Sequence, residues 1–319
     1  MSRFIYKTVI LAKIESAYGS DPTPTGAANA LQVSNVSITP LNAQNVDREL
    51  VRGYFGASEQ LVGSAYVEVA FDVEIQSSGT AGTAPAFGPL LRACGLAETV
   101  TAATRVEYNP ITDDMESVTI YYYSDGALHK LLGARGSFDM AMGVSERPVF
   151  SFRFLALNGG VTAATNATPT LTAWKTPAVI TDTNTLDVTF GGSYATGAVT
   201  GGTAYTSRGL SISSGNDVQF VPLVGAETVE IVGRTMVGKV SLDLTAAAEV
   251  TFMSTVLANT TQTVSMQHGL SAGYISLVYA PAVQLINPTK EDVSGLMLCG
   301  YDMRLVPSAG NDELQLCFK

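Results

Sequence analysis

Hydrophobic and polar residues alternate along several stretches of the chain, which is the pattern of a β-strand with one buried face. The clearest case is 63–76, whose apolar residues share one face and whose carboxylates Glu68, Asp72 and Glu74 share the other. The stretches 31–39 and 147–157 alternate in the same way. We therefore predict three long strands in the first half of the chain and a mainly β fold.

Two hairpins and two helices extend this pattern. Asp125-Gly126 separates two strand-forming runs, and the pair favours a tight turn because a type I′ turn needs positive φ at both central positions. A second hairpin is predicted over 263–288, with its turn at Ala272-Gly273. Apolar residues at helical spacing predict short helices over 87–98 and 246–259.

The order strand, helix, hairpin, strand occurs twice along the chain. Gly126 aligns with Gly273 at an offset of 147 residues, and Leu155 with Leu305 at an offset of 150, so the register hardly drifts. A fixed spacing of this kind indicates an internal repeat, here carried by pattern and element order.

The repeat divides the chain into three parts. We predict two tandem β-barrel or β-sandwich units at 1–157 and 208–319, each with a short flanking helix. The Gly-, Ala-, Thr- and Pro-rich residues 158–207 are interpreted as a linker or extended arm. Within it, 184–206 is expected to be either poorly ordered or packed on a neighbouring subunit.

The composition indicates a protein that hides much of its surface in subunit contacts. Only 14% of the residues are charged, against roughly 25% in an average soluble protein, and the mean hydropathy is positive. No apolar run approaches the ~20 residues of a membrane helix. The net charge of −10 is shared equally between 1–160 and 161–319, which argues against a protein that grips nucleic acid.

Cysteine usage and the N-terminal residues favour synthesis in a cytoplasm. The three cysteines, Cys94, Cys299 and Cys317, are odd in number and lack CxxC spacing, so neither a disulfide framework nor structural zinc is expected. Lys7 and Lys13 interrupt the apolar N-terminal residues, so no signal-peptide core forms there.

Motifs of catalysis or cofactor binding are missing from the sequence. His129 and His268 are far apart, and neither has a second ligand at metal spacing, so surface positions on strands are the expectation. Asp113, Asp114 and Glu116 lack the continuation of a calcium loop and predict a turn. No GxSxG, Walker A or GxGxxG motif occurs. We predict a protein that is not an enzyme and that holds no cofactor or metal.

Several strings resemble the tail tube (major tail) proteins of long-tailed, non-contractile bacteriophages. They are "PLLRACGLAETVTAATRVEYNP", "ESVTIYYYSDGALHKLLGARGSFDM" and "PVFSFRFLAL", with the opening "VILAKIESAYGSDPTPTGAANALQVSNVSITPL" and the ending "DMRLVPSAGNDELQLCFK". The resemblance spans nearly the whole chain, and its motifs are structural. It implies a small β-barrel or sandwich with a flanking helix, without a C-terminal immunoglobulin-like domain.

The resemblance also implies an assembly. Tail tube units join their sheets into rings, generally of six units, and the rings stack into a tube through which DNA passes without specific binding. With two units in each chain, we expect three chains per ring and pseudo-sixfold symmetry; six chains per ring is the alternative. Tape-measure and tail terminator or tip proteins are the implied partners, and the virion tail is the implied location, without a membrane.

Two sets of residues are predicted to serve the assembly. The family uses a long loop where 40–63 lies, so ring-to-ring contacts are expected from Asp47, Arg48, Glu49, Arg52 and Glu59; a plain solvated loop is the other interpretation. The channel wall is expected to be net negative, with Glu68, Asp72, Glu74 and Asp243 as candidates, although a shift of one residue would move each to the opposite face.

Two other functions stay open from the sequence. An outer-membrane β-barrel would also show alternating strands, but it would need a signal peptide and would not fit the 87–98 helix. Another β-structural virion or fibre protein, including one that processes glycans, would need carboxylates in a cleft.

Overall fold

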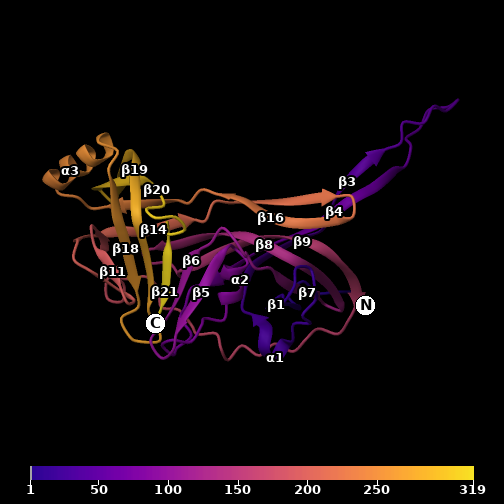
Figure 1. Ribbon diagram of the computed structural model, residues 1–319, viewed down its shortest axis with the longest axis horizontal. Helices are drawn as coiled ribbons and strands as arrows, with labels where there is room; N and C mark the ends of the chain where they lie inside the picture. The colour runs from indigo at the N-terminus through magenta and orange to yellow at the C-terminus, as the bar shows by residue number, and fades with distance from the viewer. Residues whose placement is uncertain (1) are drawn as a thin grey trace.

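The computed structural model describes residues 2–319 and is mainly β, as predicted (Figure 1). Strands dominate the first half, which runs from the N-terminus to β9. Its elements are β1 (Thr8–Ile14), α1 (Gly26–Asn29), β2 (Ala30–Leu31), β3 (Ser34–Asp47), β4 (Gln60–Glu74), α2 (Gly88–Arg92), β5 (Leu96–Thr101), β6 (Arg105–Pro110), β7 (Val118–Ser124), β8 (Ala127–Gly143) and β9 (Val149–Ala163).

The second half contains the remaining strands and the longest helix. Its elements are β10 (Val188–Phe190), β11 (Ser193–Ala195), β12 (Ala198–Thr200), β13 (Thr203–Tyr205), β14 (Ser207–Ser213), β15 (Asn216–Leu223), β16 (Ala226–Arg234), β17 (Val237–Leu242), α3 (Ala246–Leu257), β18 (Thr261–His268), β19 (Ser276–Val293), β20 (Leu296–Leu305) and β21 (Gln315–Phe318). The Gly- and Thr-rich residues 184–206 therefore form short strands rather than poorly ordered chain, and β9 extends six residues into the segment predicted as a linker.

Eight antiparallel strands form one continuous run across both halves. Their order is β3–β4–β9–β8–β14–β17–β20–β19. The two halves meet where β14 pairs with the end of β8, with Ile212 opposite Met140. A second layer closes over one face of the run, because β7 and β1 follow β8, while β18 and β10 follow β19.

The strand order is the same in the two halves. The first half pairs β3–β4–β9–β8–β7–β1, and the second pairs β14–β17–β20–β19–β18–β10. Buried faces match when Phe154 of β9 is aligned with Met303 of β20, an offset of 149. The alignment of Leu155 with Leu305 is wrong by one residue, because Leu155 lies on the face away from the core and Leu305 lies in it.

Both predicted helices form, but the first is much shorter than predicted. The α2 helix spans five residues, with Pro89 in its first turn, and Gly95 in the left-handed region (φ 77°) turns the chain into β5. The α3 helix agrees with its predicted range and begins at Thr245, whose Oγ1 accepts a hydrogen bond from the Ala248 N–H at 3.3 Å.

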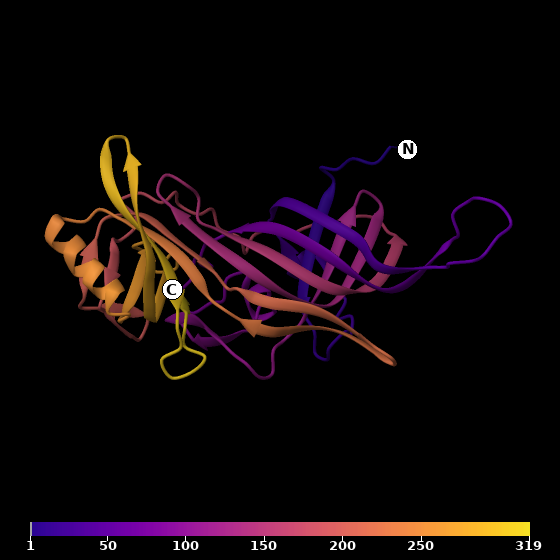
Figure 2. The same cartoon turned by 90° about the horizontal axis from the view of Figure 1, so that it is seen from above.

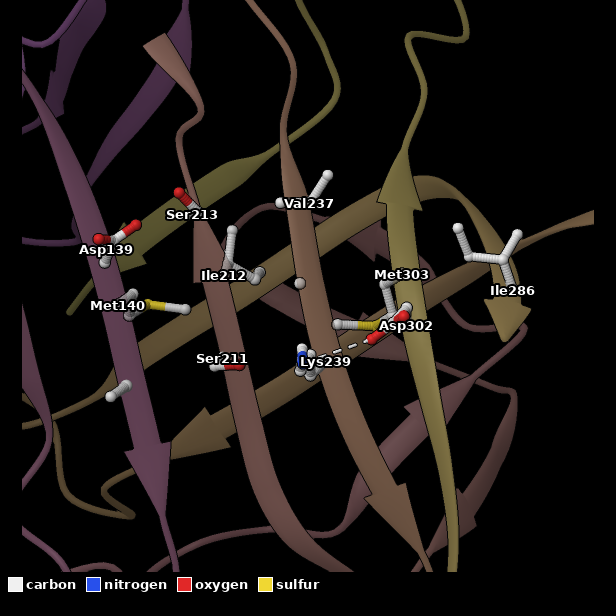
Figure 3. A pocket seen from close by; sticks show the side chains of 12 residues that line it. Asp139, Met140, Ser211, Ile212, Ser213, Val237, Lys239, Ile286, Asp302 and Met303 are labelled. Carbon is white, nitrogen blue, oxygen red and sulfur yellow. Dashed lines mark ion pairs between the residues drawn. The ribbon is translucent and has the colours of Figure 1, made fainter. Parts of the chain in front are cut away.

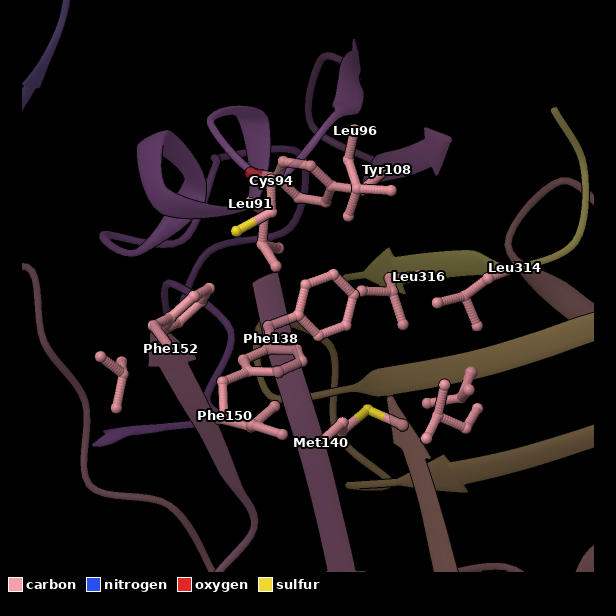
Figure 4. Close-up of a cluster of buried hydrophobic side chains, with 14 of the residues drawn as sticks. Leu91, Cys94, Leu96, Tyr108, Phe138, Met140, Phe150, Phe152, Leu314 and Leu316 are labelled. Carbon is pink, nitrogen blue, oxygen red and sulfur yellow. The ribbon is translucent and has the colours of Figure 1, made fainter. Parts of the chain in front are cut away.

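The hydrophobic core is continuous from one half to the other. In the first half, aromatic side chains from β8 and β9, including Phe138, Phe150 and Phe152, pack beneath α2 (Figure 4). Leu314 and Leu316, from the C-terminal segment, point into the same cluster. β21 explains this, because it pairs with β6 on one side and with β19 on the other.

Candidate assembly and channel surfaces

The hairpin of β3 and β4 projects beyond the body of the molecule as an arm (Figures 1 and 2). Its strands extend further than predicted, so the loop is 48–59 rather than 40–63. The arm exposes a set of large apolar side chains: Leu41, Val46, Leu50, Val51, Tyr54, Phe55, Leu61 and Val62. Exposed apolar residues gathered on one element mark a contact surface.

The charged residues predicted for ring contacts lie at the tip of this arm. Glu59 forms ion pairs with Arg48 and, at 3.2 Å, with Arg52, all within the arm. Asp47 accepts a hydrogen bond from Gln60 at 2.5 Å, and Glu49 has no ion pair among residues 2–319. The sequence placed these residues together, and the structure leaves them accessible to another molecule.

Three predicted channel residues share the outer face of β4, opposite the buried Val67, Val69, Phe71 and Val73. Each has a polar partner. Glu68 pairs with Arg153 at 2.6 Å and Glu74 with Arg147 at 2.9 Å, whereas Asp72 accepts from the side-chain amide of Asn35 at 2.6 Å.

Asp243 lies elsewhere than expected. β17 ends at Leu242, so Asp243 is in the exposed loop before α3 and not on a strand face. The strand was predicted to continue to residue 246, but Thr245 caps the helix instead.

Sequence reasoning missed the basic residues on this outer face. The alternation of β4 showed its acids, but Arg153 and Lys239 come from strands that only the fold brings alongside. On the second half, Lys239 of β17 forms an ion pair with Asp302 of β20 at 3.7 Å, and both residues line a hollow (Figure 3). The outer face of the eight-stranded run is therefore lined by partly compensated charges.

The two histidines differ, because His129 is partly exposed on β8. His268 is buried, contrary to the predicted surface position: its Nδ1 lies 2.8 Å from Thr185 Oγ1 and its Nε2 3.1 Å from the Ala178 carbonyl. Burial lowers the pKa of His268, and the carbonyl contact opposes this only in part. Asp113 and Asp114 lie in a turn, as predicted, and Glu116 pairs with Arg92 at 2.5 Å.

No group of three His, Cys, Asp or Glu side chains within residues 2–319 is arranged to hold a metal ion. Helices in the same range lack the length and apolar character needed to cross a membrane.

Comparison with protein families decides the identity. The family model described as phage tail tube protein matches residues 6–296, most of the chain. The chain belongs to the phage tail tube protein family. It is thus a structural subunit of a phage tail tube, and its family assembles by stacking into a tube. A search of curated proteins found no match.

Proposed function

We propose that three copies of this tail tube protein close into one ring, and that such rings stack around a channel for DNA. The observation that carries the proposal is the eight-stranded run, because it ends in two unpaired strand edges. β3 pairs on one side only, with β4, and 286–293 of β19 pair on one side only, with β20, within the residues that the structure describes. Unpaired edges add strands from another chain.

The junction inside the chain supports this way of closing the ring. β14 and β3 hold the same place in the strand order of their halves, and so do β8 and β19. Within the chain, Gly209–Ser213 of β14 pair with Asp139–Gly143 of β8. Pairing β3 of one copy with the outer part of β19 of the next would repeat this junction between chains, and the continuous core at the junction would repeat with it.

The size of the channel favours three chains. Three copies of eight strands supply 24 strands. With strands ~4.8 Å apart and tilted by ~40°, a closed sheet of 24 strands has a backbone diameter of roughly 50 Å, against roughly 30 Å for the strands of two chains and roughly 100 Å for those of six. Side chains then leave clearance for a hydrated DNA duplex in a ring of three chains and almost none in a ring of two, whereas a ring of six would be far wider than the duplex.

The wall of the channel is the part of the outer face on which no arm lies, because the core occupies the other face. The ion pair Glu74–Arg147 offsets part of its charge, while Asp72 has no ion pair among residues 2–319. The wall is therefore weakly negative. Such a wall repels phosphates and offers no cluster of Lys and Arg to hold them, so DNA slides.

The arm tip and the tube ends supply the remaining contacts. We assign ring-to-ring contact to 48–59, which project furthest from the body (Figure 2). A tape-measure protein inside the tube and terminator or tip proteins at its ends are the partners that this function needs. The protein acts as a structural element and not as an enzyme, and it is made in the host cytoplasm before it joins the virion tail.

Averaged end-on electron micrographs of tubes formed by the purified protein test the proposal. Threefold symmetry with six similar lobes is the expected result, because each chain contributes two similar halves. True sixfold symmetry with one chain per lobe would contradict it.

A further inference from the structure

The second half lays an arm of its own over the first half. The hairpin of β15 and β16 crosses the outer face of β8, β9 and β4 (Figure 1). The Phe220 ring packs on Tyr66, with the ring centres 5.2 Å apart. Arg135 of β8 forms an ion pair with Glu230 and donates to the Val229 carbonyl at 3.0 Å. This arm is therefore docked, and its own Val229 is buried against the first half.

The two arms hold the same place in the two halves. β15–β16 links β14 to β17, as the β3–β4 arm extends the pairing of β3 with β4. The β15–β16 arm packs on the first half of the same chain, whereas the projecting part of the β3–β4 arm packs on nothing among residues 2–319. Apolar residues of the β3–β4 arm that lie in its strands, Leu41, Val46, Leu61 and Val62, are exposed.

The equivalent receiving face in the second half is open. In the first half, the space beside β15 is lined by Glu68, Ser137 and Arg153. The equivalent residues in the second half are Val237, Ile286 and Asp302. Glu68 pairs with Leu155 across β4 and β9, as Val237 pairs with Arg304 across β17 and β20. Ser137 pairs with Arg153 across β8 and β9, as Ile286 pairs with Asp302 across β19 and β20.

These three second-half residues line the hollow of Figure 3, together with Ile212 and Met303. We call it the β17–β20 hollow. It is more apolar than its counterpart, since Val237 and Ile286 stand where Glu68 and Ser137 stand in the first half.

We propose that the β17–β20 hollow receives the β3–β4 arm of a neighbouring copy in the same ring. The occupant is a second copy because β3 and the β17–β20 hollow lie toward opposite ends of the run, with the arm pointing away from the body (Figures 1 and 2). Exposed apolar residues on the arm match an apolar hollow, and the β15–β16 arm shows how such a hairpin seats.

The β3–β4 arm is longer than the β15–β16 arm, and its strands and its tip make different contacts. The β15–β16 arm turns through two residues, Val224 and Gly225, whereas 48–59 insert twelve at the tip of the other. The strands of the β3–β4 arm therefore lie on the neighbour in the ring, and the tip extends past it toward the next ring. This inference rests on the proposed ring and specifies which surfaces join its subunits.

Photo-crosslinking in assembled rings tests the docking. A benzophenone amino acid at Leu61, in an equal mixture of ¹⁴N and ¹⁵N chains, should give crosslinks of mixed label to the strands around Val237, Ile286 or Asp302. The same probe at Phe220 is the control and should crosslink within one chain, near Tyr66. Crosslinks from Leu61 to any other surface, in rings of normal appearance, would overturn the inference while leaving the proposed function standing.

Charge in the β17–β20 hollow provides a second test. Val237→Asp with Ile286→Asp should cause loss of rings while the monomer keeps its circular dichroism spectrum, because both side chains lie on the outer face. Val250→Asp with Leu257→Asp, at two exposed positions of α3, is the matched control, because it adds the same two charges, and it should leave rings unchanged. Normal rings from the double variant would overturn the docking. An unaltered protein that forms neither rings nor tubes would instead refute the proposed function.

Discussion

Reversing the two arginines at the arm tip should separate ring stacking from folding. In Arg48→Glu/Arg52→Glu, five carboxylates gather at the tip and the net charge of the chain changes from −10 to −14. Within residues 2–319 both arginines pair only with Glu59, whose side chain is 59% exposed. Exposed pairs contribute about 0–1 kcal/mol each, so folding should lose no more than ~2 kcal/mol.

The effect on the tube should be much larger, because each joint between rings repeats the contact in every chain. Two arginines in each of three chains, at about 1 kcal/mol per pair, amount to ~6 kcal/mol per joint, or roughly a 10⁴-fold weaker association. Like-charge repulsion adds to this loss, although salt screens it over ~8 Å at physiological ionic strength. We therefore expect rings without tubes.

Sedimentation and negative-stain imaging at matched protein concentration measure this outcome, with circular dichroism to check the fold. Lys13→Glu/Lys175→Glu is the control, because it makes the same change of net charge at two exposed lysines away from the arm. Tubes of normal length from the arm variant would refute the assignment of ring-to-ring contact to 48–59. Loss of tubes in both variants would attribute the effect to net charge alone.

Three further predictions concern stability. Arg234→Met should lower the free energy of unfolding by ~3–5 kcal/mol in urea titrations, because it leaves Glu313 buried without its partner at 2.9 Å, and adding Glu313→Leu should recover part of the loss. Phe152→Ala should cost ~3–5 kcal/mol by the same assay, since Phe152 is fully buried among other aromatic rings. Burial lowers the pKa of His268, and of His129 as well, so just below pH 6.5 the unfolded chain takes up these protons more readily than the folded chain. Stability should therefore fall as the pH is lowered through that range, and His268→Asn should reduce the fall.

Much of the fold followed from local signals. The alternation in 63–76, the Asp125-Gly126 turn and the helix after Thr245 are each set by neighbouring residues, and each appears in the structure. The shared order of elements in the two halves was also visible, because strand, helix and turn signals recur in order. The residue-by-residue alignment of the two halves could not be predicted, because a shift of one residue is decided by which strand face packs in the core.

The contacts that matter for assembly were harder to predict. Nothing local in 215–235 indicates that β15 and β16 cross another sheet, because the partners Tyr66 and Arg135 lie 94 residues or more away in the sequence. The acids proposed for the channel wall were visible in β4 alone, whereas Arg153, the partner of Glu68, is brought alongside by the pairing of β4 with β9. Asp243 was misplaced because the cap of α3 ended the strand early.

Native mass spectrometry of a single ring tests the central claim most directly. Each 33.4-kDa chain supplies eight strands to the channel wall, so the account predicts a ring of three chains. A ring of six chains would contradict it, because the two halves of each chain would then not be separate units of the wall.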